Sequence, residues 1–191
     1  MLLVALSVLF LLHVEQSHAS VIVVYNGGPW GPWGTMEMCP EGTKAAGFKL
    51  KVEREQGRGD DSALNGISLS CVNTTTFLTV KEITSSVGPE GDWTDIQWCP
   101  GSYLQAFCLR VEGRQDKGDD TAANNIKFRC TNGIELEGEG MYWGSWGDWS
   151  DSCSSGIDGI LTRLEEDMGN EDDTELNDAQ FHCADEVRKK Y

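Results

Sequence analysis

Gly118-Asp-Asp-Thr-Ala-Ala-Asn-Asn-Ile-Lys-Phe-Arg-Cys130 is one of three versions of the same 13-residue sequence in this chain. The others are Gly59-Asp-Asp-Ser-Ala-Leu-Asn-Gly-Ile-Ser-Leu-Ser-Cys71 and Glu171-Asp-Asp-Thr-Glu-Leu-Asn-Asp-Ala-Gln-Phe-His-Cys183. In all three, the asparagine follows the first aspartate by five residues and precedes the cysteine by six. Such regular spacing indicates an internal repeat, in which each copy forms the same structural element.

The similarity extends upstream of each copy. Phe48-Lys-Leu-Lys-Val-Glu53 matches Phe107-Cys-Leu-Arg-Val-Glu112, with a weaker match at Ile160-Leu-Thr-Arg-Leu-Glu165. Each copy also begins with a Gly-x-Trp turn and a second cysteine. The turns match as Gly31-Pro-Trp33 before Cys39, Gly91-Asp-Trp93 before Cys99, and Gly147-Asp-Trp149 before Cys153. The repeat units then span about residues 27–71, 88–130 and 142–183.

Hydrophobic patterning within the units predicts strands. Apolar and polar residues alternate along 48–53 and again before each repeat cysteine, at 67–71, 126–130 and 179–183. A period of two is typical of a strand with one buried face, and Gly, Asn and Asp clusters mark turns. We therefore predict an all-β protein with three equivalent sheets around a pseudo-threefold axis and a shared core. The 191 residues fit a single domain, here 20–191.

Residues 1–19 predict a secretory signal peptide. The apolar run from Met1 to Leu12 is too short to span a bilayer, which takes ~20 apolar residues. Small residues at Ser17 and Ala19 fit cleavage after Ala19. The alternative is an N-terminal membrane anchor. We expect a secreted, extracellular protein without membrane insertion.

The charge of the chain restricts its partners. The net charge is -16, and removal of the signal peptide with Glu15 leaves -15. Such an excess of negative charge excludes unaided binding to nucleic acid, which needs Lys and Arg to displace counterions. It favours basic secreted or coat proteins as partners.

Seven cysteines in a secreted chain indicate a disulfide framework. The repeat predicts one disulfide in each unit. The pairs are Cys39–Cys71, Cys99–Cys130 and Cys153–Cys183. Cys108 remains as a free thiol, and we expect it to be at least partly exposed because it falls on the polar phase of its strand. A monomer with a surface thiol and a dimer or matrix linkage through Cys108 are the two interpretations.

The repeats, the Trp turns and the paired cysteines resemble the vitelline membrane outer layer protein 1 family, over about residues 21–184. The resemblance implies a disulfide-stabilised β-prism of three Greek-key sheets. It also implies secretion and association with the outer layer of egg coats or with other secretions. Familiar members carry a fourth disulfide in the third unit. Asp158 and Ala184 stand at the corresponding positions here, so this bridge is absent.

Each repeat carries an Asp-Asp-x-x-x-Asn motif. Closely spaced carboxylate and amide oxygens can ligate calcium, or they can bond to their own backbone in tight turns. Threefold repetition favours turns, because equivalent turns need the same chemistry. The residues are Asp60, Asp61, Asn65, Asp119, Asp120, Asn124, Asp172, Asp173 and Asn177.

The tryptophans have two predicted roles. Trp33, Trp93 and Trp149 share one repeat position in this matching, so we expect them to pack in the prism core. Trp30 and Trp146 also match each other, but the second unit has Glu90 there. These two are therefore the candidates for stacking on sugar rings.

The sequence offers little for catalysis. His182 is the only histidine left after signal removal, and it precedes Cys183, so triads that need a histidine base are disfavoured. No CxxC pair is present, and we expect no metal and no cofactor. Carboxylates could support glycoside chemistry. The candidates would be Glu53, Glu112 and Glu165, if the prism axis held a polar cavity.

We therefore predict a non-enzymatic structural or interaction component of an extracellular layer, either an egg coat or a mucosal secretion. The alternatives are a carbohydrate-binding module and a chito-oligosaccharide-processing transferase that acts through acidic residues. Glycans are accordingly expected as further partners. Asn73-Thr-Thr75, between the first two units, is a predicted N-glycosylation site.

Overall fold

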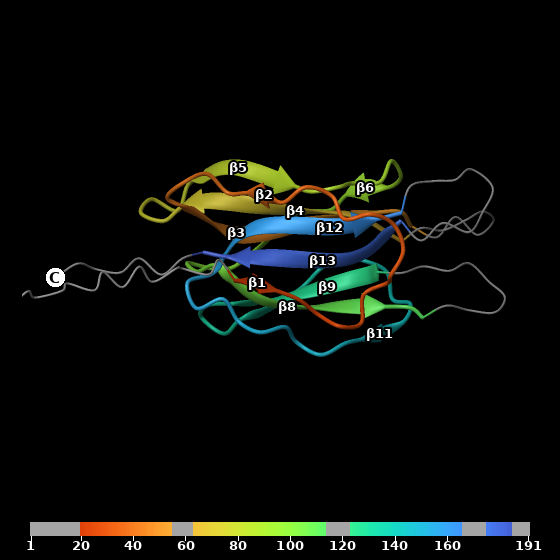
Figure 1. The fold of residues 1–191 in the computed structure, drawn as a ribbon. Helices are drawn as coiled ribbons and strands as arrows, with labels where there is room; N and C mark the ends of the chain where they lie inside the picture. Colours follow the sequence, from red (N-terminus) through yellow and green to blue (C-terminus); the bar gives the residue numbers. More distant parts are fainter. Residues whose placement is uncertain (1–19, 55–62, 114–122, 166–174, 185–191) are drawn as a thin grey trace, which may run out of the picture.

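The computed structural model describes residues 20–54, 63–113, 123–165 and 175–184, and the regular secondary structure in these ranges is all β-strand. Figure 1 shows long strands running side by side along the molecule. The six long strands are β3 (Thr43–Val52), β4 (Leu64–Asn73), β8 (Leu104–Val111), β9 (Ala123–Cys130), β12 (Ile157–Leu164) and β13 (Leu176–Cys183). The shorter ones are β1 (Val21–Ile22), β2 (Glu37–Met38), β5 (Thr79–Thr84), β6 (Asp92–Trp93), β7 (Gln97–Trp98), β10 (Glu135–Glu137) and β11 (Ser145–Trp146).

The strands form three antiparallel sheets with the same connectivity. The first sheet has the order β5-β4-β3-β6, with β7 also paired to β3, and the second has the order β10-β9-β8-β11. In each, three consecutive strands form a meander and a fourth returns beside the first of them, which is a Greek key. The third sheet has the order β1-β13-β12-β2. The predicted β-prism of three sheets is confirmed.

The first two strands of the described chain, β1 and β2, complete the third sheet. Val21 of β1 lies opposite His182 of β13, and the Cys183 N–H donates to the Ser20 carbonyl over 2.8 Å. Strand β2 pairs with β12 on the other side. Strands β1 and β2 thus lie at the two edges of the third sheet. Strands β5 and β6 have the equivalent positions in the first sheet, and β10 and β11 have them in the second.

A sequence repeat does not correspond to one sheet. Strands β6 and β7 belong to the second repeat unit but pair with β3 in the first sheet. Strand β11 of the third unit likewise pairs with β8 in the second sheet, and β2 of the first unit pairs with β12 in the third. Each unit therefore starts on one sheet and ends on the next.

The three disulfides join neighbouring sheets because the units cross between them. Cys39 follows β2 in the third sheet and is bonded to Cys71 in β4 of the first. The other two bridges continue around the prism in the same sense. They are Cys99–Cys130, from the first sheet to the second, and Cys153–Cys183, from the second to the third. The pairing is the one that the repeat predicts.

The position of the absent fourth bridge is occupied by a polar contact. Asp158 and Ala184 are the positions at which the resemblance implies an additional pair of cysteines. The carboxylate of Asp158 accepts a hydrogen bond from Nδ1 of His182 over 2.5 Å, and both side chains are largely buried. Asp158 thus makes a side-chain contact between β12 and β13, with His182 rather than with Ala184 as its partner.

Four phenylalanine rings fill the prism axis. Phe128 of β9 is fully buried and contacts a ring from each sheet, at centroid distances of 4.7 Å to Phe48, 5.1 Å to Phe181 and 6.3 Å to Phe107. Leucine and isoleucine side chains of the long strands surround them. The alternation of apolar residues in the sequence accounts for this core, since every second side chain of each strand points inward. The axis is therefore packed and apolar.

The three motif asparagines lie in strands rather than in turns, so the turn role predicted for them is wrong. Asn65, Asn124 and Asn177 are fully buried near the starts of β4, β9 and β13. The backbone carbonyl of each asparagine accepts a hydrogen bond of 2.7 Å from an N–H group in another segment of the chain. The donors are the N–H groups of Gly88, Met141 and Gly28, respectively. The buried asparagines thus mark the places where one repeat unit packs on another.

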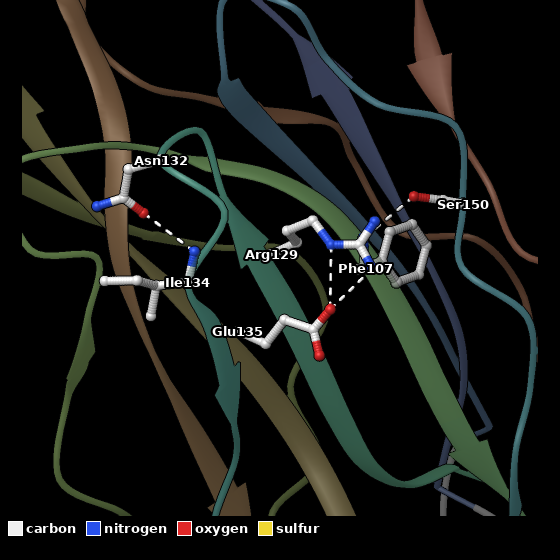
Figure 2. Close-up of polar contacts among 6 residues, drawn as sticks. All are labelled: Phe107, Arg129, Asn132, Ile134, Glu135 and Ser150. Atoms are coloured by element: carbon white, nitrogen blue, oxygen red, sulfur yellow. Dashed lines mark hydrogen bonds and ion pairs between the residues drawn. The ribbon is translucent and has the colours of Figure 1, made fainter.

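Cys108 is buried at 3% exposure, so the predicted exposed thiol is wrong. It faces away from the core, but the segment 147–150 runs alongside β8, where Gly147 and Ser150 donate their N–H groups to the carbonyls of Leu109 and Phe107. In Figure 2, the Ser150 hydroxyl accepts from the Phe107 N–H, and Arg129 pairs with Glu135 on the neighbouring strands. Burial raises the pKa of the Cys108 thiol, although nearby Lys127 lowers it.

Asp178 of β13 is a buried carboxyl in a place where the second unit has a neutral amide. Burial raises its pKa from 3.8 to about 6, although the Ala179 N–H donates to it over 2.8 Å and Arg163 lies near. Asn125 is its repeat equivalent, bonding to the Ile126 N–H and the Gly138 carbonyl. Because the folded pKa lies above the unfolded one, ionisation of Asp178 costs stability as pH rises from about 4 to about 6.

Replacement of Asp178 by asparagine is therefore expected to stabilise the protein above pH 6. The gain is about 2 kcal/mol after allowance for solvent screening. It decreases as pH falls from about 6 to about 4 and vanishes below about pH 3, where the carboxyl is protonated in both states. Urea unfolding of Asp178→Asn and the parent at pH 4, 5, 6 and 7 measures the difference. An equal difference at pH 4 and pH 7 would contradict the assignment.

Candidate functional site

A Gly-x-Trp corner crosses the end of one long strand in each sheet. Its glycine has a positive φ, +73° at Gly31, +79° at Gly91 and +72° at Gly144. A Cβ at any of the three would lie within 2.4 Å of a backbone atom of that strand. Glycine is thus needed for both the conformation and the close approach. The corner begins with Gly91 in the first sheet, Gly144 in the second and Gly31 in the third.

The tryptophan of each corner pairs with a basic residue at one repeat position. The pairs are Trp93 with Lys51, Trp146 with Arg110 and Trp33 with Arg163. Trp146, and not Trp149, is therefore the third equivalent. The predicted match was wrong by three residues, because the third unit contains two consecutive Gly-x-Trp sequences, at 144–146 and 147–149.

The prediction that Trp33, Trp93 and Trp149 pack in the prism core is also wrong. Trp93 is 39% exposed, and the other two are half-buried. A cation lies against each ring on the outside of the prism and stabilises this outward position. The distances to the ring centres are 5.6 Å from the Arg163 guanidinium to Trp33, 5.3 Å from Lys49 Nζ to Trp93, and 4.3 Å from the Arg129 guanidinium to Trp149.

The two predicted sugar-stacking residues lie in different environments. Trp30 is 46% exposed next to Gly31, so part of its indole is open to a ligand. Trp146 is half-buried, with Lys127 Nζ 4.2 Å and the Arg110 guanidinium 5.9 Å from its ring centre. Two cations therefore lie against the Trp146 ring, whereas one, Lys49, lies against the more exposed Trp93 ring.

The three repeat glutamates lie at separate corners rather than in one cavity. A Cβ added to each corner glycine would lie 2.5 Å from the backbone N atom of one of these glutamates. The pairs are Gly91 with Glu53, Gly144 with Glu112 and Gly31 with Glu165. Glu53 is 7% exposed, and the other two are half-buried. Because phenylalanine rings fill the axis, the described core has no axial cavity that would join the three carboxylates.

A groove of about 340 Å³ lies at the first-sheet corner; we call it the Trp93 groove. It combines a partly exposed indole with the carboxylates of Glu53, Glu90 and Asp92 and the guanidinium of Arg54. Glu90, Asp92 and Arg54 are exposed. The lining residues are Val52, Glu53, Arg54, Glu90, Gly91, Asp92, Trp93 and Thr94.

A second groove, of about 320 Å³, lies between Val23–Asn26 and Gly147–Asp151. Tyr25 on its edge is 98% exposed. The Asn26 amide donates to the Leu109 carbonyl over 3.0 Å, while its buried Oδ1 has no hydrogen-bond partner among the described residues. Sequence reasoning missed Tyr25. The available signal was an aromatic residue between the apolar run 21–24 and the Asn-Gly-Gly turn.

The donor sets suit a hydroxyl-rich ligand better than a metal ion. Within the described ranges, His, Cys, Asp and Glu side chains form no group of three or more placed to hold a metal. The six motif aspartates weighed as calcium ligands lie outside the described residues. In the grooves, aromatic faces adjoin carboxylates and amides, a combination that stacks on apolar sugar faces and accepts bonds from hydroxyl groups.

The architecture is that of the β-prism lectins. A Calsepa lectin solved in complex with a bisected glycan superposes with a TM-score of 0.55 at 13% identity, covering 88% of this chain and 99% of the lectin. Artocarpin, solved in complex with mannotriose, gives a TM-score of 0.53 at 13% identity, covering 87% and 97%. At such low identity, the likeness shows the fold alone.

Residues 20–186 match the family described as Vitelline membrane outer layer protein I (VOMI), and the chain belongs to this family. The vitelline membrane outer layer protein 1 homolog of Mus musculus is 48% identical over 174 residues, which cover 90% of this chain and 87% of the mouse protein. The Homo sapiens homolog is 49% identical over 172 residues, covering 89% and 85%. No helix in the described part of the chain is long and apolar enough to cross a membrane.

Proposed function

We propose that this protein is a secreted, non-enzymatic component of an extracellular layer, an egg coat or a mucosal secretion, and that it binds glycans in the Trp93 groove. Family membership supports the extracellular layer, because the family is named for the outer layer of the vitelline membrane. The fold supports a glycan ligand, since related β-prisms were solved with glycans. The Trp93 groove is the observation on which glycan binding rests.

The groove can bind a sugar unit through two kinds of contact. The exposed part of the Trp93 indole packs on the C–H face of a pyranose, and the carboxylates of Glu90 and Asp92 accept hydrogen bonds from its hydroxyls. Arg54 can donate to ring or hydroxyl oxygens. A volume of about 340 Å³ is at the lower end for ligand pockets, so we expect one or two sugar units to fit.

Replacement of Trp93 by alanine is expected to weaken glycan binding at least tenfold, or about 1.4 kcal/mol, because it removes the stacking surface. A glycan array identifies a ligand, and titration of that glycan into the parent and Trp93→Ala measures the change. Trp98→Ala is the matched control. Trp98 is 41% exposed in β7 of the same sheet but does not line the groove, so its loss leaves affinity unchanged.

The two variants decide the proposal together. Equal loss of affinity in Trp93→Ala and Trp98→Ala would place the ligand elsewhere on the sheet. An array without binding above background would overturn glycan recognition altogether. Both side chains lie on the surface, so we expect each variant to keep its fold. Circular dichroism of each variant checks this.

The non-enzymatic assignment rests on the separation of the three repeat glutamates by the packed axis. Glu53 does share the Trp93 groove with two other carboxylates, which keeps a glycan-processing activity as the alternative. Incubation with chito-oligosaccharides followed by mass spectrometry separates the two, since an unchanged distribution of chain lengths supports binding alone.

Secretion and partners complete the proposal. We infer cleavage after Ala19, so that the mature chain begins at Ser20, whose carbonyl accepts a hydrogen bond from the Cys183 N–H. Net charge supports basic coat proteins as further partners, with binding that weakens as salt screens the surface. The burial of Cys108 favours a monomer over a dimer linked through this thiol.

A further inference from the structure

The turn between β4 and β5 carries the Asn73-Thr-Thr75 sequence and lies at the opposite end of the first sheet from the Trp93 groove. Asn73 pairs with Thr43 at the start of β3, whereas the groove adjoins Val52 at its end. The turn is closed by two backbone bonds of 2.9 Å, from the Asn73 N–H to Leu78 and from the Phe77 N–H to Asn73. It therefore forms a defined structure between two strands.

The side chain of Asn73 is held by its oxygen only. Its Oδ1 accepts hydrogen bonds from the N–H groups of Thr75 and Thr76, over 2.9 and 3.0 Å, and from the Thr76 hydroxyl over 3.3 Å. Among the described residues, the amide nitrogen of Asn73 donates to no acceptor. A substituent on this nitrogen can thus be added without breaking a contact that shapes the turn.

The same turn presents an aromatic platform, Phe77 with Tyr103. The two rings stack with centroids 5.4 Å apart and planes inclined by 11°, and Phe77 is 43% exposed. The Tyr103 hydroxyl donates to the Thr74 carbonyl over 3.4 Å, and Lys44 Nζ lies 5.3 Å from the Tyr103 ring centre. These contacts position Tyr103 against the turn, and Leu78, 69% exposed, continues the apolar surface.

Phe77 occupies a backbone conformation that disfavours it. Its φ is +57°, in the left-handed region, where glycine or asparagine would be accommodated at lower cost. A bulky, exposed aromatic residue at such a position has no packing role in the core. Its ring instead adds to a surface next to a modifiable amide.

We propose that Asn73 carries an N-linked oligosaccharide whose first sugar packs on the Phe77–Tyr103 platform. The amide nitrogen forms a bond to the anomeric carbon of an oligosaccharide supplied by a pyrophosphate-linked lipid carrier. The bond from that carbon to the pyrophosphate oxygen breaks, and the lipid pyrophosphate leaves with the electron pair. The amide keeps one of its two protons and releases the other to water. The Thr75 side chain completes the acceptor sequence.

The attached sugar accounts for the exposed apolar surface of this turn. C–H faces of sugars pack on aromatic rings, so the glycan covers Phe77 and restricts the turn in one conformation. A protein partner could also cover this surface, but the attachment point lies in the same turn. The glycan is therefore the occupant that the local geometry favours. This inference is independent of glycan binding in the Trp93 groove.

Matched threonine variants test the modification. The full chain is secreted from a eukaryotic host as the parent, Thr75→Ala and Thr76→Ala, and intact masses are measured before and after peptide-N-glycosidase treatment. We expect a glycan on the parent and on Thr76→Ala but not on Thr75→Ala, because only Thr75 belongs to the acceptor sequence. An unmodified parent would overturn the proposal.

A double-mutant cycle tests the platform. Melting temperatures are compared for the parent, Thr75→Ala, Phe77→Ala and the double variant, all secreted from the same host. We expect the glycan to raise the melting temperature by about 2–4 °C when Phe77 is present and by about 0 °C in Phe77→Ala. A stabilisation of the same size in both backgrounds would show that the sugar does not pack on the platform.

Discussion

Replacement of Phe128 by alanine is expected to lower the free energy of unfolding by about 3–5 kcal/mol. The ring is fully buried and touches an aromatic ring from each of the three sheets. Truncation removes its transfer free energy and leaves a cavity at the axis that three covalently linked sheets cannot readily close. The loss is a large part of the 5–15 kcal/mol that is usual for a domain of this size.

Denaturant unfolding of Phe128→Ala and the parent measures this loss through the transition midpoint and slope. Tyr25→Ala is the matched control, since Tyr25 is 98% exposed and its truncation is expected to change stability by at most about 0.5 kcal/mol. Phe128→Leu should fall between the two. A cost below about 1 kcal/mol for Phe128→Ala would mean that the axis is not packed as described.

Removal of the Cys39–Cys71 disulfide is expected to cost roughly 3–4 kcal/mol. The bridge closes a loop of sequence separation 32, and the chain-entropy model assigns this amount to the restriction of the unfolded state. The other two bridges have separations of 31 and 30, so their removal should cost nearly the same. Each bridge also fastens one pair of adjacent sheets, so none is structurally redundant.

The three paired cysteine-to-alanine variants are compared by denaturant unfolding under non-reducing conditions. Cys108→Ala is the control, because it removes a buried sulfur without opening a loop, at a cost of about 1 kcal/mol. Clearly unequal costs for the three bridges would contradict the loop-length account and would point to differences in how the sheets pack.

Sequence repetition predicts the three sheets and the disulfides well, because both depend on residues that recur at fixed spacing. The inward side of each strand also follows from alternation, as Phe48 and Phe128 demonstrate. The sequence does not predict to which sheet each short strand belongs. Strands β2, β6 and β11 contain only two residues each, too few for a periodic pattern. Their pairing depends on tertiary contact with β12, β3 and β8, which no local signal records.

The site was predicted less well than the fold. Gly147-Asp-Trp149 matches Gly91-Asp-Trp93 letter by letter, yet Gly144 has the positive φ and the close approach that define the corner. The prediction therefore followed residue identity, whereas the corner is defined by the backbone conformation of its glycine. Trp33, Trp93 and Trp149 were expected inside because they were matched to one repeat position, but neighbouring Arg and Lys side chains stabilise them on the outer faces.

Glu53 was the most informative of the predicted carboxylates. It was chosen as one of three that would meet at the axis, and the structure instead places it in the Trp93 groove with Glu90 and Asp92. Glu90 is the residue that breaks the Trp repeat in the second unit. Departure from the repeat therefore coincides with the candidate groove, which a search for repeated residues alone does not reveal.

Pairing of β1 with β13 has a consequence for the order of folding. The third sheet needs both β1 and β13, so its ladder cannot form before β13 has emerged from the ribosome. The first and second sheets can assemble during synthesis, since their Greek keys are complete once β11 has appeared. Closure of the prism then follows the assembly of the other two sheets, and the contacts of longest sequence separation are expected to be the slowest to form.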